Sequence, residues 1–203
     1  KQNTVDFINI TSTSISMSGQ SVQITNDADA DASSIDVSVD ESILAVVVSK
    51  GACNRGELYL INTSSLQKSG PYELGYNPDA VDIAVDNKYV VVVNEFDYED
   101  GVDGGCDNLG FPGVSIYDIS SGIDKALLVN DMKISHTGSN GNLAEPEGVK
   151  IAPNGTTVYM TLQESNELGW FSINNPPDVL VDKVTFTNPE HCLLYTSDAA
   201  DEG

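Results

Sequence analysis

The chain has 203 residues, and its 31 acidic against 9 basic side chains give a formal net charge of −22 at pH 7. This charge repels nucleic-acid phosphates and argues against a nucleic-acid partner. The sequence holds no apolar run of the roughly 20 residues that a membrane-spanning helix needs. Its abundant Val, Ile, Thr and Tyr favour an all-β protein.

The first predicted strands cover residues 5–12 (VDFINITS) and 21–25 (SVQIT). They match the third and fourth strands of the repeat units that follow. The chain starts without an initiator methionine or a signal peptide. We therefore expect an internal fragment of a longer protein, and we expect it to begin in the middle of a unit.

Three stretches are copies of one another, residues 33–51, 78–96 and 146–164. Each contains an alternating strand, a tight polar turn and a second, more apolar strand. A third strand follows each copy, and fourth strands are expected near Tyr72, from Lys125 and from Val179. β units that recur in this way form an array, because no single unit can bury its own apolar faces.

The spacing of the copies indicates a propeller. The step from Asp36 to Asp82 fits the roughly 40–50 residues of a four-stranded blade. The longer step from Asp82 to Lys150 carries two insertions, residues 96–112 and 130–145. We predict a partial β-propeller, an open arc of about three four-stranded antiparallel blades plus part of a preceding blade. The predicted inner strands are residues 35–39, 81–85 and 149–152.

We assign residues 1–191 to this single propeller fragment. The predicted blades cover residues 4–25 (partial), 33–75, 78–135 and 146–187. The remaining segment, residues 192–203, contains CLLYTSDAADE, which resembles a translated sequencing adapter. Such scars are excluded from reasoning about the fold, and we expect the natural protein to continue with further blades.

Two cysteines, Cys53 and Cys106, lie in equivalent loops of neighbouring units. Such loops emerge on one face, so a disulfide between the two blades is geometrically reasonable. Three sequons, at Asn9, Asn62 and Asn154, are compatible with glycosylation. Together these features favour a secreted or cell-surface glycoprotein.

Two segments resemble the choice-of-anchor I propeller domain of secreted and surface proteins. One is PDAVDIAVDNKYVVVVNEF with its acidic loop and GVSIYDISSG, and the other is PEGVKIAPNGTTVYMTLQESNELGWFSI. The resemblance covers roughly residues 33–173. Members are often labelled alkaline phosphatase-like or esterase-like, and some are cell-surface glycoproteins. The resemblance implies a propeller, but an activity does not follow, since one fold hosts unrelated functions.

Four carboxylates occupy equivalent positions in two units. Asp79 and Glu147 precede the first strand, and Glu95 and Glu164 follow the second. In a propeller these positions open on the same face, so the acids could converge near the central channel. Clustered carboxylates suit Ca²⁺, which takes about 6–8 oxygen ligands. Acids that only cap turns and face solvent are the competing interpretation.

Other chemistry has little support in the sequence. The acids that begin at Asp27 lack the glycine and the glutamate of an EF-hand loop, and the acidic loop after Phe96 has the composition of a solvated loop. The only histidines are His136 and His191, and no nucleophile elbow accompanies them. Catalytic residues therefore stay unassigned.

The sequence leaves two functions open. The first is an extracellular or cell-surface binding module whose loop-bearing face contacts a small molecule, a glycan or a protein. The second is a calcium-dependent phosphohydrolase or esterase, with Asp79, Glu95, Glu147 and Glu164 holding the metal. Neither requires nucleic acid, and no membrane span is expected in this fragment.

Overall fold

The computed structural model describes residues 3–51, 53–96, 110–135, 144–180 and 182–186. Within these ranges the chain forms β-strands and one short 3₁₀-helix, η1 (Ile123–Lys125). No helix in these ranges is long and apolar enough to cross a membrane. The prediction of an all-β fold is confirmed.

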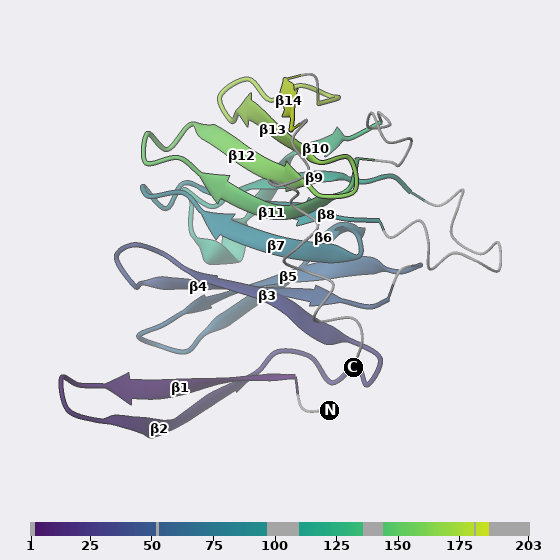
Figure 1. The fold of residues 1–203 in the computed structure, drawn as a ribbon. Coiled ribbons are helices and arrows are strands. Elements are labelled where there is room, and N and C mark those ends of the chain that lie inside the picture. Colours follow the sequence, from purple (N-terminus) through teal and green to yellow (C-terminus); the bar gives the residue numbers. More distant parts are fainter. Residues whose placement is uncertain (1–2, 52, 97–109, 136–143, 181, 187–203) are drawn as a thin grey trace.

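Three four-stranded antiparallel sheets and one hairpin make up the molecule (Figure 1). The hairpin pairs β1 (Thr4–Ile10) with β2 (Ile15–Gln23). The first sheet runs in the order β3 (Asp31–Val37), β4 (Ile43–Ser49), β5 (Arg55–Asn62) and β6 (Lys68–Tyr76). The second runs β7 (Pro78–Ile83), β8 (Tyr89–Asn94), β9 (Gly113–Asp118) and β10 (Leu127–Lys133), and the third runs β11 (Pro146–Ile151), β12 (Thr157–Leu162), β13 (Glu167–Ser172) and β14 (Lys183–Thr185).

The polar turns between the first two strands of each sheet adopt the backbone that their residues favour. Glu41, Asn87 and Gly155 each have a positive φ, at 60°, 55° and 72°. In the first two turns an Asp at the preceding position accepts the backbone N–H two residues later, as an Asx turn does (Asp40 from Ser42, Asp86 from Lys88). The turns are therefore closed by local chemistry that the sequence already showed.

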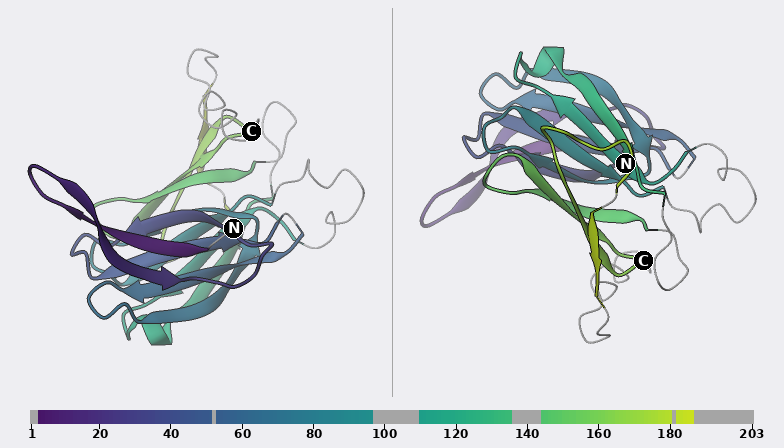
Figure 2. Two further views of the ribbon diagram at one scale, coloured as in Figure 1. Left: turned by 90° about the horizontal axis from the view of Figure 1, so that it is seen from below. Right: turned by 90° about the horizontal axis from the view of Figure 1, so that it is seen from above.

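The sheets stack in chain order, with β7 lying between β3 and β11 (Figure 1). Figure 2 shows the third sheet splayed away from the first two, in the way that propeller blades fan out. One apolar cluster fills the space between the first and second sheets, another lies between the second and third, and a third lies between the hairpin and the first sheet. Neighbouring sheets thus bury apolar side chains against one another, as the repeat interpretation requires.

Carboxylates at one repeat position join neighbouring inner strands. Asp36 Oδ2 on β3 accepts the Ile83 N–H of β7 at 2.8 Å. Asp82 Oδ2 on β7 accepts the Ile151 N–H of β11 at 2.6 Å, and Lys150 Nζ donates to the other oxygen of Asp82. Both innermost junctions are therefore held by a hydrogen bond from a carboxylate to a backbone amide, in addition to apolar packing.

The strand boundaries differ from the predicted ones in a regular way. The inner strands begin three or four residues earlier than expected and end before the predicted limit, because a backbone hydrogen bond closes each turn (Ser38 N–H to Ile43, Ala84 N–H to Tyr89, Ala152 N–H to Thr157). β2 also begins earlier than predicted, at Ile15, because it pairs with β1 from Ile10↔Ile15 to Thr4↔Gln23. Pairing partners set these limits, and local patterns do not show them.

Candidate binding face

One end of the sheets carries the connections β4–β5, β8–β9 and β12–β13 and the starts of β3, β7 and β11. We call this end the loop-bearing face. It lies on the right of Figure 1, and both long insertions leave from it. Residues 97–109 and 136–143 of those insertions lie outside the described residues.

The four acids predicted to hold a metal all lie at the loop-bearing face. Asp79 is on β7 and Glu147 on β11, while Glu95 and Glu164 follow β8 and β12. All four side chains are half-buried. Among the described residues, no three Asp, Glu, His or Cys side chains form a group that could hold a metal ion. The four acids thus share one face of the sheets. The calcium site stays a prediction.

Glu95 is positioned by a short hydrogen-bond chain between the first two sheets. Asn77 Nδ2 donates to Glu95 Oε2 at 2.8 Å, and Asn77 Oδ1 accepts from Ser49 Oγ at 3.0 Å. The Glu95 N–H also donates to the Asn77 carbonyl at 3.0 Å. Asn77 adopts a φ of 42°, a conformation that Asn tolerates better than most residues. The half-buried Glu95 carboxylate is thus held in place by Asn77.

Asn94, the neighbour of Glu95 at the end of β8, is buried between sheets. Its side chain is 1% exposed. Oδ1 accepts the Gly75 N–H at 3.0 Å, and Nδ2 donates to Ser115 Oγ at 3.0 Å. Both ends of the amide are engaged in joining β6 to β8 and β9. Its role in this structure is to join the sheets.

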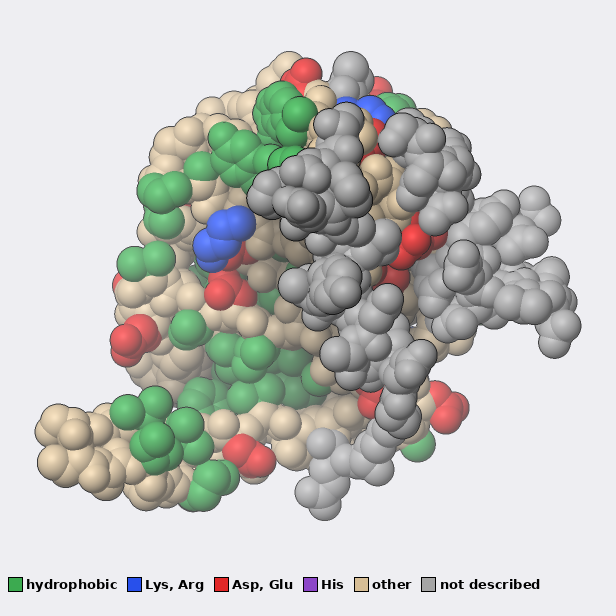
Figure 3. All heavy atoms as spheres, in the orientation of Figure 1, with side chains coloured by type: hydrophobic (Ala, Val, Ile, Leu, Met, Phe, Trp, Pro, Cys, Tyr) green, Lys and Arg blue, Asp and Glu red, His purple; other side chains and the backbone are tan. Residues whose placement is uncertain are grey.

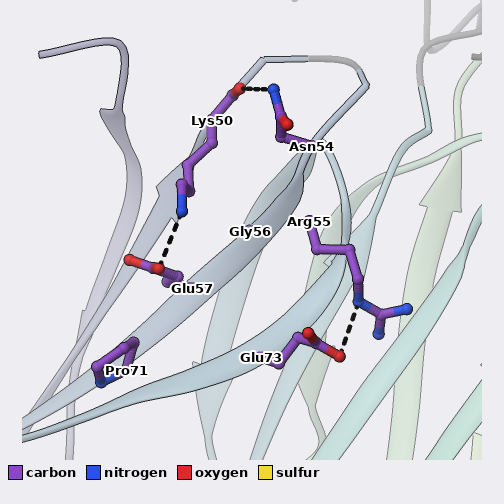
Figure 4. A pocket seen from close by; sticks show the side chains of 7 residues that line it. All are labelled: Lys50, Asn54, Arg55, Gly56, Glu57, Pro71 and Glu73. Carbon is purple, nitrogen blue, oxygen red and sulfur yellow. Dashed lines mark hydrogen bonds and ion pairs between the residues drawn. The ribbon is translucent and has the colours of Figure 1, made fainter. Parts of the chain in front are cut away.

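A cavity of about 360 Å³ opens beside the β4–β5 connection (Figure 4). It is lined by side chains of opposite charge from the first sheet, together with an amide, a proline and a glycine: Lys50, Asn54, Arg55, Gly56, Glu57, Pro71 and Glu73. Sequence reasoning missed this site. The available signal was the placement of two of the few basic residues, Lys50 and Arg55, on either side of Cys53.

Two ion pairs flank the cavity. Lys50 Nζ lies 3.1 Å from Glu57 Oε1, and Arg55 Nε lies 3.0 Å from Glu73 Oε1, although the second pair lacks hydrogen-bond geometry. Asn54 Nδ2 donates to the Lys50 carbonyl at 2.9 Å. Two cations therefore face two anions, and the lining carries no net charge while it offers both donors and acceptors.

Neighbouring aromatic side chains fix these charged groups. Tyr59 donates its hydroxyl to Glu57 Oε2 at 2.8 Å, and burial raises the pKa of Tyr59 to about 12, so this proton is retained. The Arg55 guanidinium lies 5.7 Å from the ring centroid of Tyr76. The cavity wall is thus held in place before any ligand arrives, which lowers the entropic cost of binding.

A second, smaller cavity of about 40 Å³ lies between the first and second sheets. Arg55 lines it together with Tyr76, Asn94 and Asp131. A space of this size holds about one water molecule, whose share of liquid volume is about 30 Å³. Arg55 therefore borders both cavities.

The remaining predicted residues are placed as follows. Cys53 lies in the β4–β5 connection, but Cys106 is outside the described residues, so their bridge stays a prediction. Asn9 and Asn154 are exposed, and the side-chain oxygen of Asn62 accepts the backbone N–H groups of Ser64 and Ser65. His136, His191 and residues 192–203 also lie outside the described part of the chain.

Comparison with known proteins agrees with the propeller. The sequence model of the choice-of-anchor I domain matches residues 1–177. No curated protein matches the chain. A functionally unknown protein from Desulfotomaculum acetoxidans DSM 771 is similar in structure, with a TM-score of 0.65 and 12% identity over 92% of this chain and 50% of its own.

Two further structures share the fold at low identity. A luciferin-regenerating enzyme matches with a TM-score of 0.59 and 13% identity, over 93% of this chain and 58% of its own. The Dos1 propeller matches with a TM-score of 0.55 and 14% identity, over 82% of this chain and 37% of its own. The chain thus spans little more than half of these structures at most. At such identities the likeness shows the fold alone.

Proposed function

Because the chain belongs to the choice-of-anchor I domain family, we propose that it is an extracellular or cell-surface β-propeller module that binds its ligand through the loop-bearing face. Loops at one end of a rigid β scaffold are a common place for binding residues. The family and the strong negative charge are compatible with an extracellular setting. The proposal extends to the whole protein, which we expect to bind its ligand in the same way.

The cavity between Lys50 and Glu73 is the observation that carries the proposal. Its size lies within the roughly 300–1,000 Å³ typical of small-ligand sites. A lining with paired charges gives no advantage to an anion or a cation, while its donors and acceptors match hydroxyl groups. An uncharged glycan is therefore the ligand class that fits best.

Saturation-transfer NMR and calorimetry with lactose, cellobiose and chitobiose test this assignment. Glucuronate and inorganic phosphate serve as charged comparators. We expect at least one neutral disaccharide to bind, and we expect Asn54→Ala to weaken it about fivefold, the equivalent of one net hydrogen bond. Asn175→Ala, at an exposed turn after β13, is the matched control and should leave binding unchanged.

Two results would overturn the assignment. One is preferential binding of glucuronate or phosphate over all neutral sugars. The other is sugar binding that survives both Asn54→Ala and Glu73→Gln, since the ligand would then sit elsewhere. Thermal unfolding of each variant separates loss of the site from loss of the fold.

Calcium binding and the hydrolase alternative stay predictions. A bound ion stabilises the folded state by about 2.7 kcal/mol at a hundredfold excess over its Kd. Millimolar Ca²⁺ should therefore raise the thermal midpoint, and the double variant Glu95→Gln/Glu147→Gln should abolish the rise. No rise in the unmodified protein removes the calcium site. Calcium-dependent turnover of p-nitrophenyl phosphate or acetate is the corresponding test of the hydrolase.

A further inference from the structure

A row of polar side chains crosses the second sheet on the side that faces the first. Asn94 Nδ2 on β8 donates to Ser115 Oγ on β9 at 3.0 Å, and Ser115 Oγ donates to Asp131 Oδ1 on β10 at 3.4 Å. Asn94 and Ser115 are each 1% exposed. The residues equivalent to Asn94 are Val48 and Leu162, since each of the three pairs with the residue before the bulge of its inner strand. At this position the second sheet alone carries a polar side chain.

The small cavity of about 40 Å³ lies against this row. Three glycines line it, Gly75, Gly110 and Gly113. A Cβ at Gly110 would lie 2.4 Å from the ring of Tyr76, and one at Gly113 would lie 2.4 Å from the carbonyl oxygen of Met132. The wall of the cavity is therefore in close contact with its surroundings, and these positions cannot supply a side chain that fills the space.

Arg55 borders the same cavity from the first sheet, and one of its polar atoms lacks a partner. Arg55 Nε is buried and has no hydrogen-bond partner among the described residues. Glu73 Oε1 lies 3.0 Å from it, but outside hydrogen-bond geometry. Basic side chains are scarce, 9 against 31 acidic ones, and Figure 3 shows few of them on the face that it draws. A cation placed between two sheets with an unsatisfied donor needs an acceptor that the side chains do not supply.

Size and charge select water as the occupant of the small cavity. Its volume is close to the about 30 Å³ that a water molecule takes up in the liquid. The Arg55 guanidinium repels a cation and the Asp131 carboxylate repels an anion, whereas water can accept from the first and donate to the second. Asn94 can also take part, because its amide has a second hydrogen besides the one donated to Ser115. A water molecule here therefore reaches the roughly three partners that buried waters have.

We propose that the small cavity holds one ordered water molecule, which accepts a hydrogen bond from Arg55 Nε and donates one to Asp131. The water joins the first sheet to the polar row of the second, and such a bridge is nearly as favourable as a direct hydrogen bond. It also fixes Arg55, which lines the larger cavity as well. Asp131 does not line the larger cavity, so it is a positioning residue that acts through the water and Arg55. This last step rests on the proposed glycan site.

Water-to-protein Overhauser spectra of the chain, recorded without sugar, test the water site. We expect a cross-peak between water and the Arg55 Nε–H, of the sign that marks a long-lived bound water and not proton exchange. Asp131→Leu keeps the size of the side chain but removes its acceptors, and it should abolish the cross-peak. Asp131→Asn keeps one acceptor oxygen, so this matched control should retain the cross-peak. Asp131 is exposed, so both variants should fold, and thermal unfolding checks that they do.

Disaccharide affinity tests the step from the water to the ligand. Asp131→Leu should weaken binding about threefold, and Asp131→Asn should recover most of that loss. Equal affinity of Asp131→Leu and the unmodified protein overturns the positioning role. Failure of every sugar to bind contradicts the proposed function alone, because the cross-peak is recorded without sugar.

Two results would overturn the water site itself. One is the absence of the cross-peak in the unmodified protein, or an equal cross-peak in Asp131→Leu. The other is an anomalous bromide peak in the small cavity of bromide-soaked crystals, since an anion would then be the occupant.

Discussion

The closed junctions and the open face of the first sheet are built from the same sequence pattern. Ile83 and Ile151 are almost fully buried, whereas Val37 at the same repeat position is half exposed. The turn, the strand and the alternation around all three are alike. The comparison teaches that an inner-strand side chain of this fold is buried only where a neighbouring sheet packs against it, whatever the sequence of its own sheet.

The largest expected difference concerns the apolar residues. Ile83→Ala should lower the free energy of unfolding by about 3 kcal/mol, because buried aliphatic truncations leave a cavity. Val37→Ala should cost less than about 0.5 kcal/mol, as exposed substitutions do. Urea denaturation of both variants measures the two values. Equal costs would show that the face around Val37 is covered in solution.

The repeat-position acids should give the next effect. Asp82→Ala removes the acceptor of the Ile151 N–H and the partner of Lys150, and we expect a loss of about 2 kcal/mol. Lys150 is 72% exposed, so its charge stays solvated and adds little. Asp36→Ala removes only the acceptor of the Ile83 N–H, so we expect the free energy of unfolding to fall by about 1 kcal/mol. Chemical denaturation measures both losses. If Asp36→Ala lowered the free energy of unfolding more than Asp82→Ala does, this expected order would be wrong.

Gly75 on β6 tests how closely the first and second sheets pack. A Cβ added at Gly75 would lie 2.5 Å from Cγ of Asn94, so Gly75→Ala should cost about 1–3 kcal/mol through overpacking. Adding Asn94→Ala should recover part of that loss, because it removes the contacts with Cγ and Nδ2 while the Cβ of residue 94 still lies 2.7 Å away. The double-mutant cycle measures the coupling. Additive costs would mean that the two sheets are not in contact there.

The smallest effect is a dependence on pH. Burial raises the pKa of Asp82 above its ordinary 3.8, against the lowering effect of Lys150. The folded state then holds more protons than the unfolded state between the two pKa values, so Asp82 makes stability fall as pH rises above about 3.8. Asp82→Asn should remove this slope from the curve of thermal midpoint against pH.

Asp40 provides the opposite case within the same protein. Hydrogen bonds from Asn87, Ser38 and Ser42 lower its pKa, so its contribution is present above the unfolded pKa and is lost as pH falls. Asp40→Asn should therefore reduce the fall of the thermal midpoint at low pH, whereas Asp82→Asn should not. The same slope in Asp82→Asn and in the unmodified protein would contradict the burial of Asp82.

The repeats made the fold predictable, and the loop-bearing face with it. Alternating strands, Asx turns and copied segments are local features, so the sequence shows them directly. The shared position of Asp36 and Asp82 was also visible. Their role was not, because the amides that they bind belong to residues 47 and 69 positions further along the chain.

The cavity illustrates what local patterns leave out. Lys50 and Glu57 pair across a turn, but Arg55 meets Glu73 only because β5 and β6 are registered side by side. The engagement of Asn94 with Gly75 likewise depends on two sheets meeting. No spacing in the sequence predicts such contacts, since they depend on the register and packing of separate elements.

The sequence by itself determined the all-β class, the repeat unit, its turns and the end of the sheets that carries the long loops. These depend on side-chain alternation and on residues that favour tight turns, which act over a few positions. Only the tertiary structure decided which copies of a position are buried and which acids hold neighbouring strands. Burial and hydrogen bonding across sheets depend on the surface that meets each strand, and that surface comes from a distant part of the chain.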